Sequence, residues 1–231
     1  MPGASRHATR RRVRSIVPLL AFVCLPVAGA GNLSDDEWLD GDVEQRALEV
    51  NEGALEFYSR PPATRVHHYD NSITITGRSL VDGWVEMHQC HEHLDPVPRV
   101  QIVFSPSHLR DLEVTSSRRI GRAWVEGATV QLANVRRGAR LCLRAKSRAL
   151  SPGTDGEYVL RNGPYMRRFL DGYYPMHVTM NVHLPAAGMT LVRVSPRTQP
   201  GFRVRQHGRT IRLEAWFTGR LVTELHLREA P

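Results

Sequence analysis

The densest group of side chains that could do chemistry reads Met-His-Gln-Cys-His-Glu-His and begins at Met87. Imidazole nitrogens together with a thioether sulfur suit copper, and imidazole nitrogens also bind zinc. Successive side chains of a strand point to opposite faces, so Met87, His91 and His93 would share one face. The predicted metal site therefore uses these three side chains and an imidazole from a neighbouring strand, such as His67 or His68.

The same histidines have a second interpretation as ordinary side chains on the surface of a sheet. Their spacing lacks the paired cysteines or the helical histidine pair that zinc proteins use. His88 and His93 recur as His177 and His183 in the repeat described below, where no such cluster surrounds them. We therefore expect no cofactor, with copper or zinc as the alternative.

Cys90 and Cys142 are the two cysteines beyond the first thirty residues. An even number of cysteines in an exported protein favours a disulfide. Strand alternation puts Cys90 on a polar face with Glu92, and Cys142 on a polar face with Arg140. We predict a Cys90–Cys142 bridge, which would stabilise the fold by about 2–4 kcal/mol, mostly through the unfolded state.

The segment from Asn162 to Pro175, called here the Tyr/Arg loop, is the best candidate for recognition of a partner. It holds three of the six tyrosines and two adjacent arginines. Both residue types anchor interfaces, because they bury a large area and keep a polar tip. The candidate binding residues are Tyr165, Arg167, Arg168, Tyr173 and Tyr174. The alternative is that these side chains pack between two halves of the chain.

No motif in the sequence predicts a catalytic residue. The nucleophile elbow Gly-x-Ser-x-Gly, the zinc motif His-Glu-x-x-His, the Cys-x-x-Cys pair, the phosphate-binding loop and the dinucleotide fingerprint do not occur. We therefore favour a protein that is not an enzyme. A hydrolase or lyase that acts on an envelope polysaccharide is an alternative, because residues on separate strands can assemble a catalytic site.

The first thirty residues predict export. Five arginines precede an apolar stretch of 13 residues from Ile16 to Ala28, and small residues follow up to Ala30. A membrane-spanning helix needs about 20 apolar residues, so this stretch is typical of a secretory signal and not of an anchor. We predict cleavage after Ala30 and a periplasmic or secreted protein with no transmembrane anchor.

The charge of the chain is divided unevenly. Residues 31–56 hold nine acidic residues and one arginine, whereas residues 57–231 carry a net charge of +11. An exported protein seldom meets nucleic acid, so we expect none as a partner. A basic body then indicates an envelope protein with an acidic face, an acidic glycan or an anionic lipid surface.

A repeat organises the elements that must position these residues. Arg78–His88 matches Arg167–His177 at five of eleven positions, with an offset of 89. Ala123–Gly127 matches Ala215–Gly219 at an offset of 92. An ordered series of matches with a slowly growing offset indicates an internal duplication of units of about 80 to 90 residues.

Both units have the two-residue period of strands. Alternate residues are apolar in Met176, Val178, Met180, Val182 and Leu184, and again in Ile211, Leu213, Ala215 and Phe217. Turn signals separate such runs at short intervals. We predict a mainly β protein made of two tandem antiparallel β-sandwich, Ig-like units, residues 64–150 and 151–231. A single large β-barrel or open sheet is the alternative.

Only one segment has a helical pattern. Residues 33–58 have this pattern: Ser34 and Glu37 form a capping box, and an apolar stripe follows from Leu39 to Ala54. The paired prolines at 61 and 62 end the pattern. We therefore predict an acidic helical segment and proline linker at residues 31–63.

Taken together, these features predict an exported, non-catalytic binding, scaffold or assembly protein. It would contact a protein or another part of the cell envelope through strand edges and the Tyr/Arg loop. A periplasmic copper-binding protein is the main alternative.

Overall fold

Strands dominate the part of the chain that the structure, a computed structural model, describes, residues 53–185 and 188–229. The prediction of a mainly β protein is confirmed. Within these residues no helix is long and apolar enough to cross a membrane. The predicted signal peptide and residues 31–52 of the predicted helical segment lie outside the described residues.

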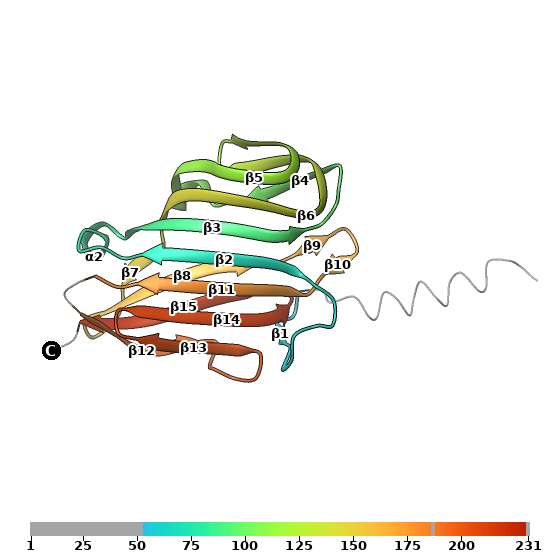
Figure 1. The fold of residues 1–231 in the computed structure, drawn as a ribbon. Helices are drawn as coiled ribbons and strands as arrows, with labels where there is room; N and C mark the ends of the chain where they lie inside the picture. Colours follow the sequence, from blue (N-terminus) through green and yellow to red (C-terminus); the bar gives the residue numbers. More distant parts are fainter. Residues whose placement is uncertain (1–52, 186–187, 230–231) are drawn as a thin grey trace, which may run out of the picture. The chain divides into compact units, whose positions relative to one another are not determined.

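The larger sheet has nine strands, seven of them in one continuous order, β1-β14-β11-β2-β3-β6-β4 (Figure 1). β13 pairs with β14, and β5 pairs with β6. In chain order the strands are β1 (Glu56–Phe57), β2 (His67–Thr74), β3 (Trp84–Leu94), β4 (Arg99–Val103), β5 (Leu109–Glu126), β6 (Thr129–Arg148), β11 (Met176–His183), β13 (Phe202–His207) and β14 (Thr210–Thr218).

A smaller sheet has four strands in the order β12-β15-β8-β7. They are β7 (Leu150–Pro152), β8 (Glu157–Tyr165), β12 (Met189–Ser195) and β15 (Leu221–Glu229). A separate hairpin is formed by β9 (Arg168–Phe169) and β10 (Gly172–Tyr173), and the short helices are α2 (Ser79–Asp82) and the 3-10 turn Pro106–His108. The hairpin and α2 lie at opposite ends of the sheets (Figure 1).

The two sheets share one apolar core. Its members from the larger sheet include Ile73, Met180 and Phe217, and those from the smaller sheet include Leu160 and Leu225. All five apolar residues of the run 176–184 and all four of the run 211–217 are buried. The predicted strands and buried faces of β11 and β14 are therefore confirmed, because alternate residues of a strand line one face.

β4, β5 and β6 build a lobe with its own smaller core. β6 pairs with β3 through residues 139–148 and with β4 through residues 129–133, while β5 runs along its other edge. This pairing brings together buried side chains that include Leu132, Leu141 and Leu143. Three register irregularities interrupt the pairing of β5 with β6. Such bulges bend a strand and increase its twist, which curls the lobe over its own core.

The predicted units 64–150 and 151–231 do not form separate sheets. β2 from the first unit and β11 from the second are parallel neighbours, paired from His67 with Met176 to Thr74 with His183. β7 crosses the predicted boundary at residue 150 and pairs with β8. The finer prediction of tandem Ig-like sandwiches is therefore not confirmed. Each unit leaves a strand edge open, and pairing β2 with β11 satisfies the backbone groups of both.

The segments matched by the repeat have different local structures. Residues 78–88 contain helix α2 followed by β3, whereas residues 167–177 contain the β9–β10 hairpin followed by β11. The shared Asp-Gly pairs do mark turns in both, since Gly83 and Gly172 have positive φ angles of 76° and 130°. A common turn signal therefore does not show a common fold.

The end of the predicted helical segment is extended. β1 pairs with the end of β14, Glu56 with Thr218 and Phe57 with Phe217. The Phe57 ring packs at 5.2 Å from that of Phe202 and at 6.5 Å from that of Phe217. The helical prediction is therefore wrong over residues 53–58, because these contacts with the core favour a strand over the local helical pattern.

Candidate functional site

The predicted disulfide joins the facing strands β3 and β6. Cys90 and Cys142 are direct cross-strand partners, with their Cα atoms 4.1 Å apart, and their sulfurs are bonded. The prediction is confirmed. The bridge lies on the polar face of the larger sheet, where Arg140 Nη2 also approaches Cys90 Sγ at 3.4 Å.

His67 and His91 meet on the opposite, core-facing side of the larger sheet. The distance from His67 Nε2 to His91 Nδ1 is 3.0 Å, and Gln89 Nε2 lies 2.5 Å from the other ring nitrogen of His91. The sequence pattern placed these two imidazoles together as ligands of one predicted metal site. In the structure they hydrogen-bond to each other, and His91 also hydrogen-bonds to Gln89.

Burial determines the charge of this histidine pair. It lowers the pKa of His67 to about 4, with Arg167 and the neighbouring histidines lowering it further and Asp95 opposing them. Burial also lowers the pKa of His91 well below its ordinary value. Both imidazoles are therefore neutral at pH 7 and act as hydrogen-bonding groups of the interior.

The three predicted metal ligands are not gathered at one point. Met87 and His91 share a face, but four residues of strand separate them by about 13 Å. His93 has a positive φ of 56° at a register shift of β3, so it does not continue the alternation. Within residues 53–185 and 188–229, no group of three or more His, Cys, Asp or Glu side chains is placed to hold a metal ion. Alternation predicted the common face of Met87 and His91, but it could not predict the register shift at His93.

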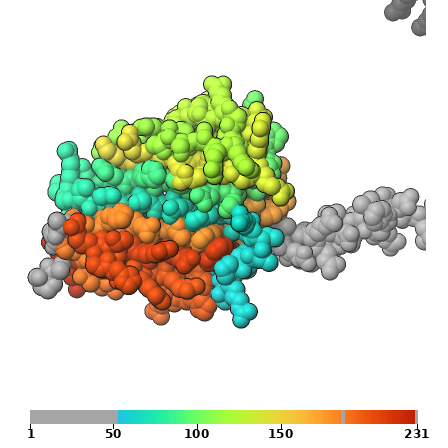
Figure 2. Space-filling view, viewed as in Figure 1, coloured from blue at the N-terminus to red at the C-terminus, as the bar shows by residue number. Residues whose placement is uncertain are grey.

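A row of polar and aromatic side chains crosses the exposed face of the larger sheet. Each member is the direct cross-strand partner of the next, which places all of them on one face. The row runs over β14, β11, β2, β3, β6 and β5 as Trp216, His177, His68, Glu92, Arg140 and Arg118. Strands β2, β11 and β14 are visible at the surface on this side of the molecule (Figure 2).

One end of this row is a stack of rings. The Trp216 and His177 rings lie 3.7 Å apart, and the His177 and His68 rings lie 4.3 Å apart. Desolvation is the main cause that lowers the pKa of His177 to about 4, and His68 adds to it. Thr179 Oγ1 lies 2.9 Å from His68 Nε2 and donates a hydrogen bond of 2.6 Å to Asp70. These hydrogen bonds through Thr179 fix the position of the His68 ring in the stack.

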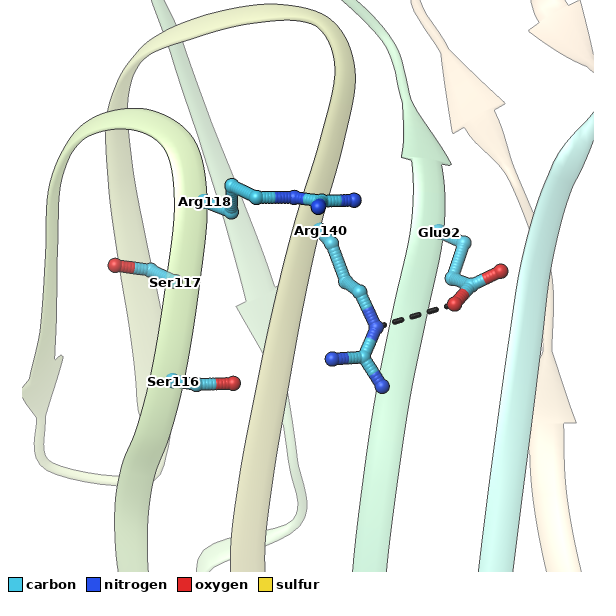
Figure 3. A pocket seen from close by; sticks show the side chains of 5 residues that line it. All are labelled: Glu92, Ser116, Ser117, Arg118 and Arg140. Carbon is cyan, nitrogen blue, oxygen red and sulfur yellow. Dashed lines mark hydrogen bonds and ion pairs between the residues drawn. The ribbon is translucent and has the colours of Figure 1, made fainter.

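The other end of the row borders a shallow hollow of ≈ 370 Å³ (Figure 3). Arg140 Nε donates to Glu92 Oε1 at 3.1 Å across its floor. The side chains of Arg118 and Ser116 point toward β6 on the same side of the ribbon (Figure 3). Its lining residues are Glu92, Ser116, Ser117, Arg118 and Arg140. Sequence reasoning missed this site, because its residues come from three strands and belong to no motif.

Tyr165 does not belong to an exposed recognition loop. It ends β8 with only 5% of its surface exposed, and its ring packs at 4.9 Å from that of Tyr69. Its hydroxyl donates to Met180 Sδ at 3.7 Å, and burial raises its pKa. As a surface anchor the prediction is wrong, because the strand pairing of β8 with β15 turns this side chain into the core.

Arg167 holds the β9–β10 hairpin against the rest of the protein. Its Nε and Nη2 atoms donate to the two carboxylate oxygens of Asp95 at 2.9 and 2.6 Å, and Nη1 donates to the Pro175 carbonyl at 3.3 Å. The Arg167 side chain is 18% exposed. Arg167 thus links the two halves of the chain, as the alternative interpretation of the loop predicted.

The remaining residues of the Tyr/Arg loop form the hairpin surface. The Arg168 guanidinium lies 5.6 Å from the Tyr173 ring centre, and the Tyr174 ring packs on Phe169. Tyr174 also donates a hydrogen bond to Asp171, which raises the pKa of the Tyr174 hydroxyl. Leu170, which sequence reasoning missed, is fully exposed at the tip. A leucine directly before an Asp-Gly turn was the only signal for it.

The sequence matches no family model and no curated protein. Among solved structures, a mutant M1 zinc metallopeptidase from Deinococcus radiodurans bound to a Tyr-Ser-Ala substrate has a TM-score of 0.37 at 17% identity, over 79% of this chain and 45% of that chain. A two-domain M1 zinc metallopeptidase mutant bound to L-tryptophan has a TM-score of 0.35 at 16% identity, over 79% and 45%. The chain thus spans less than half the length of either structure, and the likeness is too low to carry a functional argument.

Proposed function

We propose that this chain is an exported, non-catalytic binding or assembly protein that docks on a cell-envelope protein through the β9–β10 hairpin. The observation that carries the proposal is the hairpin tip. Leu170 is fully exposed there, while Arg167 and Asp95 hold the hairpin base against the body of the protein. An exposed apolar side chain on an anchored support is typical of a contact residue.

Two features of the hairpin favour binding: its exposed leucine and its restrained base. Transfer of a leucine side chain from water into a pocket yields about 1.5–3 kcal/mol. The two hydrogen bonds from Arg167 to Asp95 limit the movement of the hairpin, so less conformational entropy is lost when a partner binds. A rigid tip therefore keeps more of the energy from burial of Leu170.

The hairpin also indicates the chemistry of its partner. Exposed Arg168 lies next to Leu170, and residues 57–231 carry a net charge of +11. The matching surface would be an apolar pocket with an acidic rim. The predicted signal peptide supports an envelope location, periplasmic or secreted, for this partner.

Open strand edges are a second contact surface of this proposal. Among the described residues, β4 and β5 each pair only with β6. The bulges of β5 make its edge less regular, and irregular edges resist the addition of another strand. The hairpin is therefore the first surface to test.

The experiment uses a photo-crosslinking amino acid in the full chain in its own cells. We expect placement at Leu170 to trap one envelope protein, and placement at Val81, another highly exposed apolar site, on α2, to trap none. In a second step, Leu170→Ser with Arg168→Glu should abolish co-purification of that protein and leave the melting temperature unchanged. Retention of the partner by this variant, or equal trapping through Val81, would refute the proposal.

A further inference from the structure

We propose that the hollow between β3, β6 and β5 binds a uronic acid residue of an acidic glycan. Its lining combines the guanidinium groups of Arg118 and Arg140, the hydroxyl of Ser116 and the carboxylate of Glu92. This combination differs from the hairpin in place and in chemistry. The inference therefore goes beyond the proposed function and stands or falls separately from it.

The two arginines supply the donors for a carboxylate. Arg118 is exposed and has no ion-pair partner among the described residues. Arg140 uses Nε for Glu92 and Nη2 for Cys90 Sγ, and its Nη1 has no hydrogen-bond partner in the described part of the chain. As direct cross-strand neighbours on one face, the two guanidinium groups can reach the same oxyanion.

Glu92 indicates that the ligand is more than a simple anion. Its Oε1 accepts from Arg140, and its Oε2 lies 3.8 Å from His68 Nδ1. A carboxylate repels any anion, a uronate included, but it accepts a hydrogen bond from a hydroxyl group, which a uronic acid has and a sulfate ion lacks. Ser116 adds a hydroxyl that can donate and accept. A ligand that carries both a carboxylate and hydroxyl groups, such as a uronic acid, matches all of these groups at once.

The surroundings favour a glycan over a lipid or an apolar peptide side chain. None of the five lining residues is aromatic or aliphatic, so no large apolar side chain is present to pack against an acyl chain. Residues 99–148, which form β4 to β6, contain eleven basic and three acidic residues. Such a field raises the local concentration of a polyanion and orients its approach. The open, shallow shape also admits one residue of an extended chain.

The test is calorimetric titration of the purified protein, at low ionic strength, with an oligosaccharide of galacturonic acid. The matched ligands are the neutral galactose oligosaccharide of the same length and sodium sulfate. We expect binding of the acidic oligosaccharide only. Arg118→Gln should weaken this binding by about ten- to a hundredfold, because hydrogen bonds to charged groups are among the stronger ones.

Arg122→Gln is the matched control, since Arg122 lies on the same strand, stacks on Trp124 and does not line the hollow. It removes the same charge and should change the affinity less than about twofold. If both variants lowered the affinity for the acidic oligosaccharide equally, binding would be due to general electrostatic attraction and the proposal would be wrong. Equal binding of sulfate, or of the neutral oligosaccharide, would also overturn it. Because Arg118 has no ion pair among the described residues, a melting curve should confirm that its variant remains folded.

Discussion

At the scale of single residues, histidines have two different roles in this protein. His67 and His91 hydrogen-bond inside the protein, while His177 and His68 stack with Trp216 on the exposed face. Sequence reasoning treated His67, His68 and His91 as possible metal ligands, and His177 as an ordinary side chain on the surface of a sheet. The role of each histidine depends on its neighbours across the sheet, and these neighbours cannot be identified from the sequence pattern.

The pair of His91, which is buried, and His67, which is half-buried, makes stability depend on pH. The pKa of His67 is about 4 in the fold, below its ordinary value of 6.5, so the unfolded chain binds more protons between these values. Stability is therefore complete above about pH 6.5 and falls as the pH drops toward 4. His67 alone would contribute a loss of the order of 3 kcal/mol.

Urea denaturation at pH 7 and pH 5 would measure this loss. His67→Phe should make the pH dependence shallower, although His91 and His177 still contribute to it, whereas His207→Phe, a change at an exposed histidine of β13, should leave it intact. The same slope in all three proteins would mean that other groups carry the pH dependence.

At the scale of elements, hydrogen-bonded neighbours explain both the confirmed disulfide and the failed loop prediction. Cys90 and Cys142 pair because β3 and β6 are adjacent and in register. Tyr165 is buried because β8 continues to its position, while the chain beyond it turns out into the β9–β10 hairpin. The Tyr/Arg loop is therefore the end of a strand followed by a hairpin, with different roles along its length.

The disulfide gives a prediction at this scale. A double variant, Cys90→Ala with Cys142→Ala, opens a loop with a sequence separation of 52. We expect its free energy of unfolding to fall by about 2–4 kcal/mol, because the unfolded chain gains conformational entropy. Chemical denaturation of both proteins, with and without reductant, measures this change. Reductant should destabilise only the natural sequence, and a response of the double variant would contradict the assignment.

At the scale of the whole molecule, the parallel pairing of β2 with β11 joins the two halves of the chain. The core that lies between the sheets takes side chains from both halves, among them Ile73 and Val178. A destabilising substitution on one side of residue 150 should therefore also lower the stability of the other side. Two tandem sandwiches, as predicted from the repeat, would behave as independent units.

This difference can be measured with single-tryptophan proteins that keep either Trp84, at the start of β3, or Trp216, in β14. Ile73→Ala removes a side chain that is 1% exposed and should cost about 2–5 kcal/mol. We expect it to lower the urea midpoint seen by both tryptophans equally. If the urea midpoint shifted only in the protein that keeps Trp84, the two halves would unfold as separate units.

The sequence by itself determined the local features of the fold. The apolar alternation of residues 176–184 and 211–217 predicted two strands and their buried faces, and the polar phase of Cys90 and Cys142 favoured their bridge. Side-chain alternation is a local property of an extended chain, so it can be recognised without knowledge of neighbouring strands.

Only the tertiary structure decided which strands are neighbours. The pairing of β2 with β11, the contact of Arg167 with Asp95 and the meeting of Arg118 with Arg140 all depend on that order. Strand pairing uses backbone N–H and C=O groups that nearly every residue has, so side-chain patterns specify it weakly. For the same reason, the candidate glycan site, built from three strands, is evident only in the folded chain.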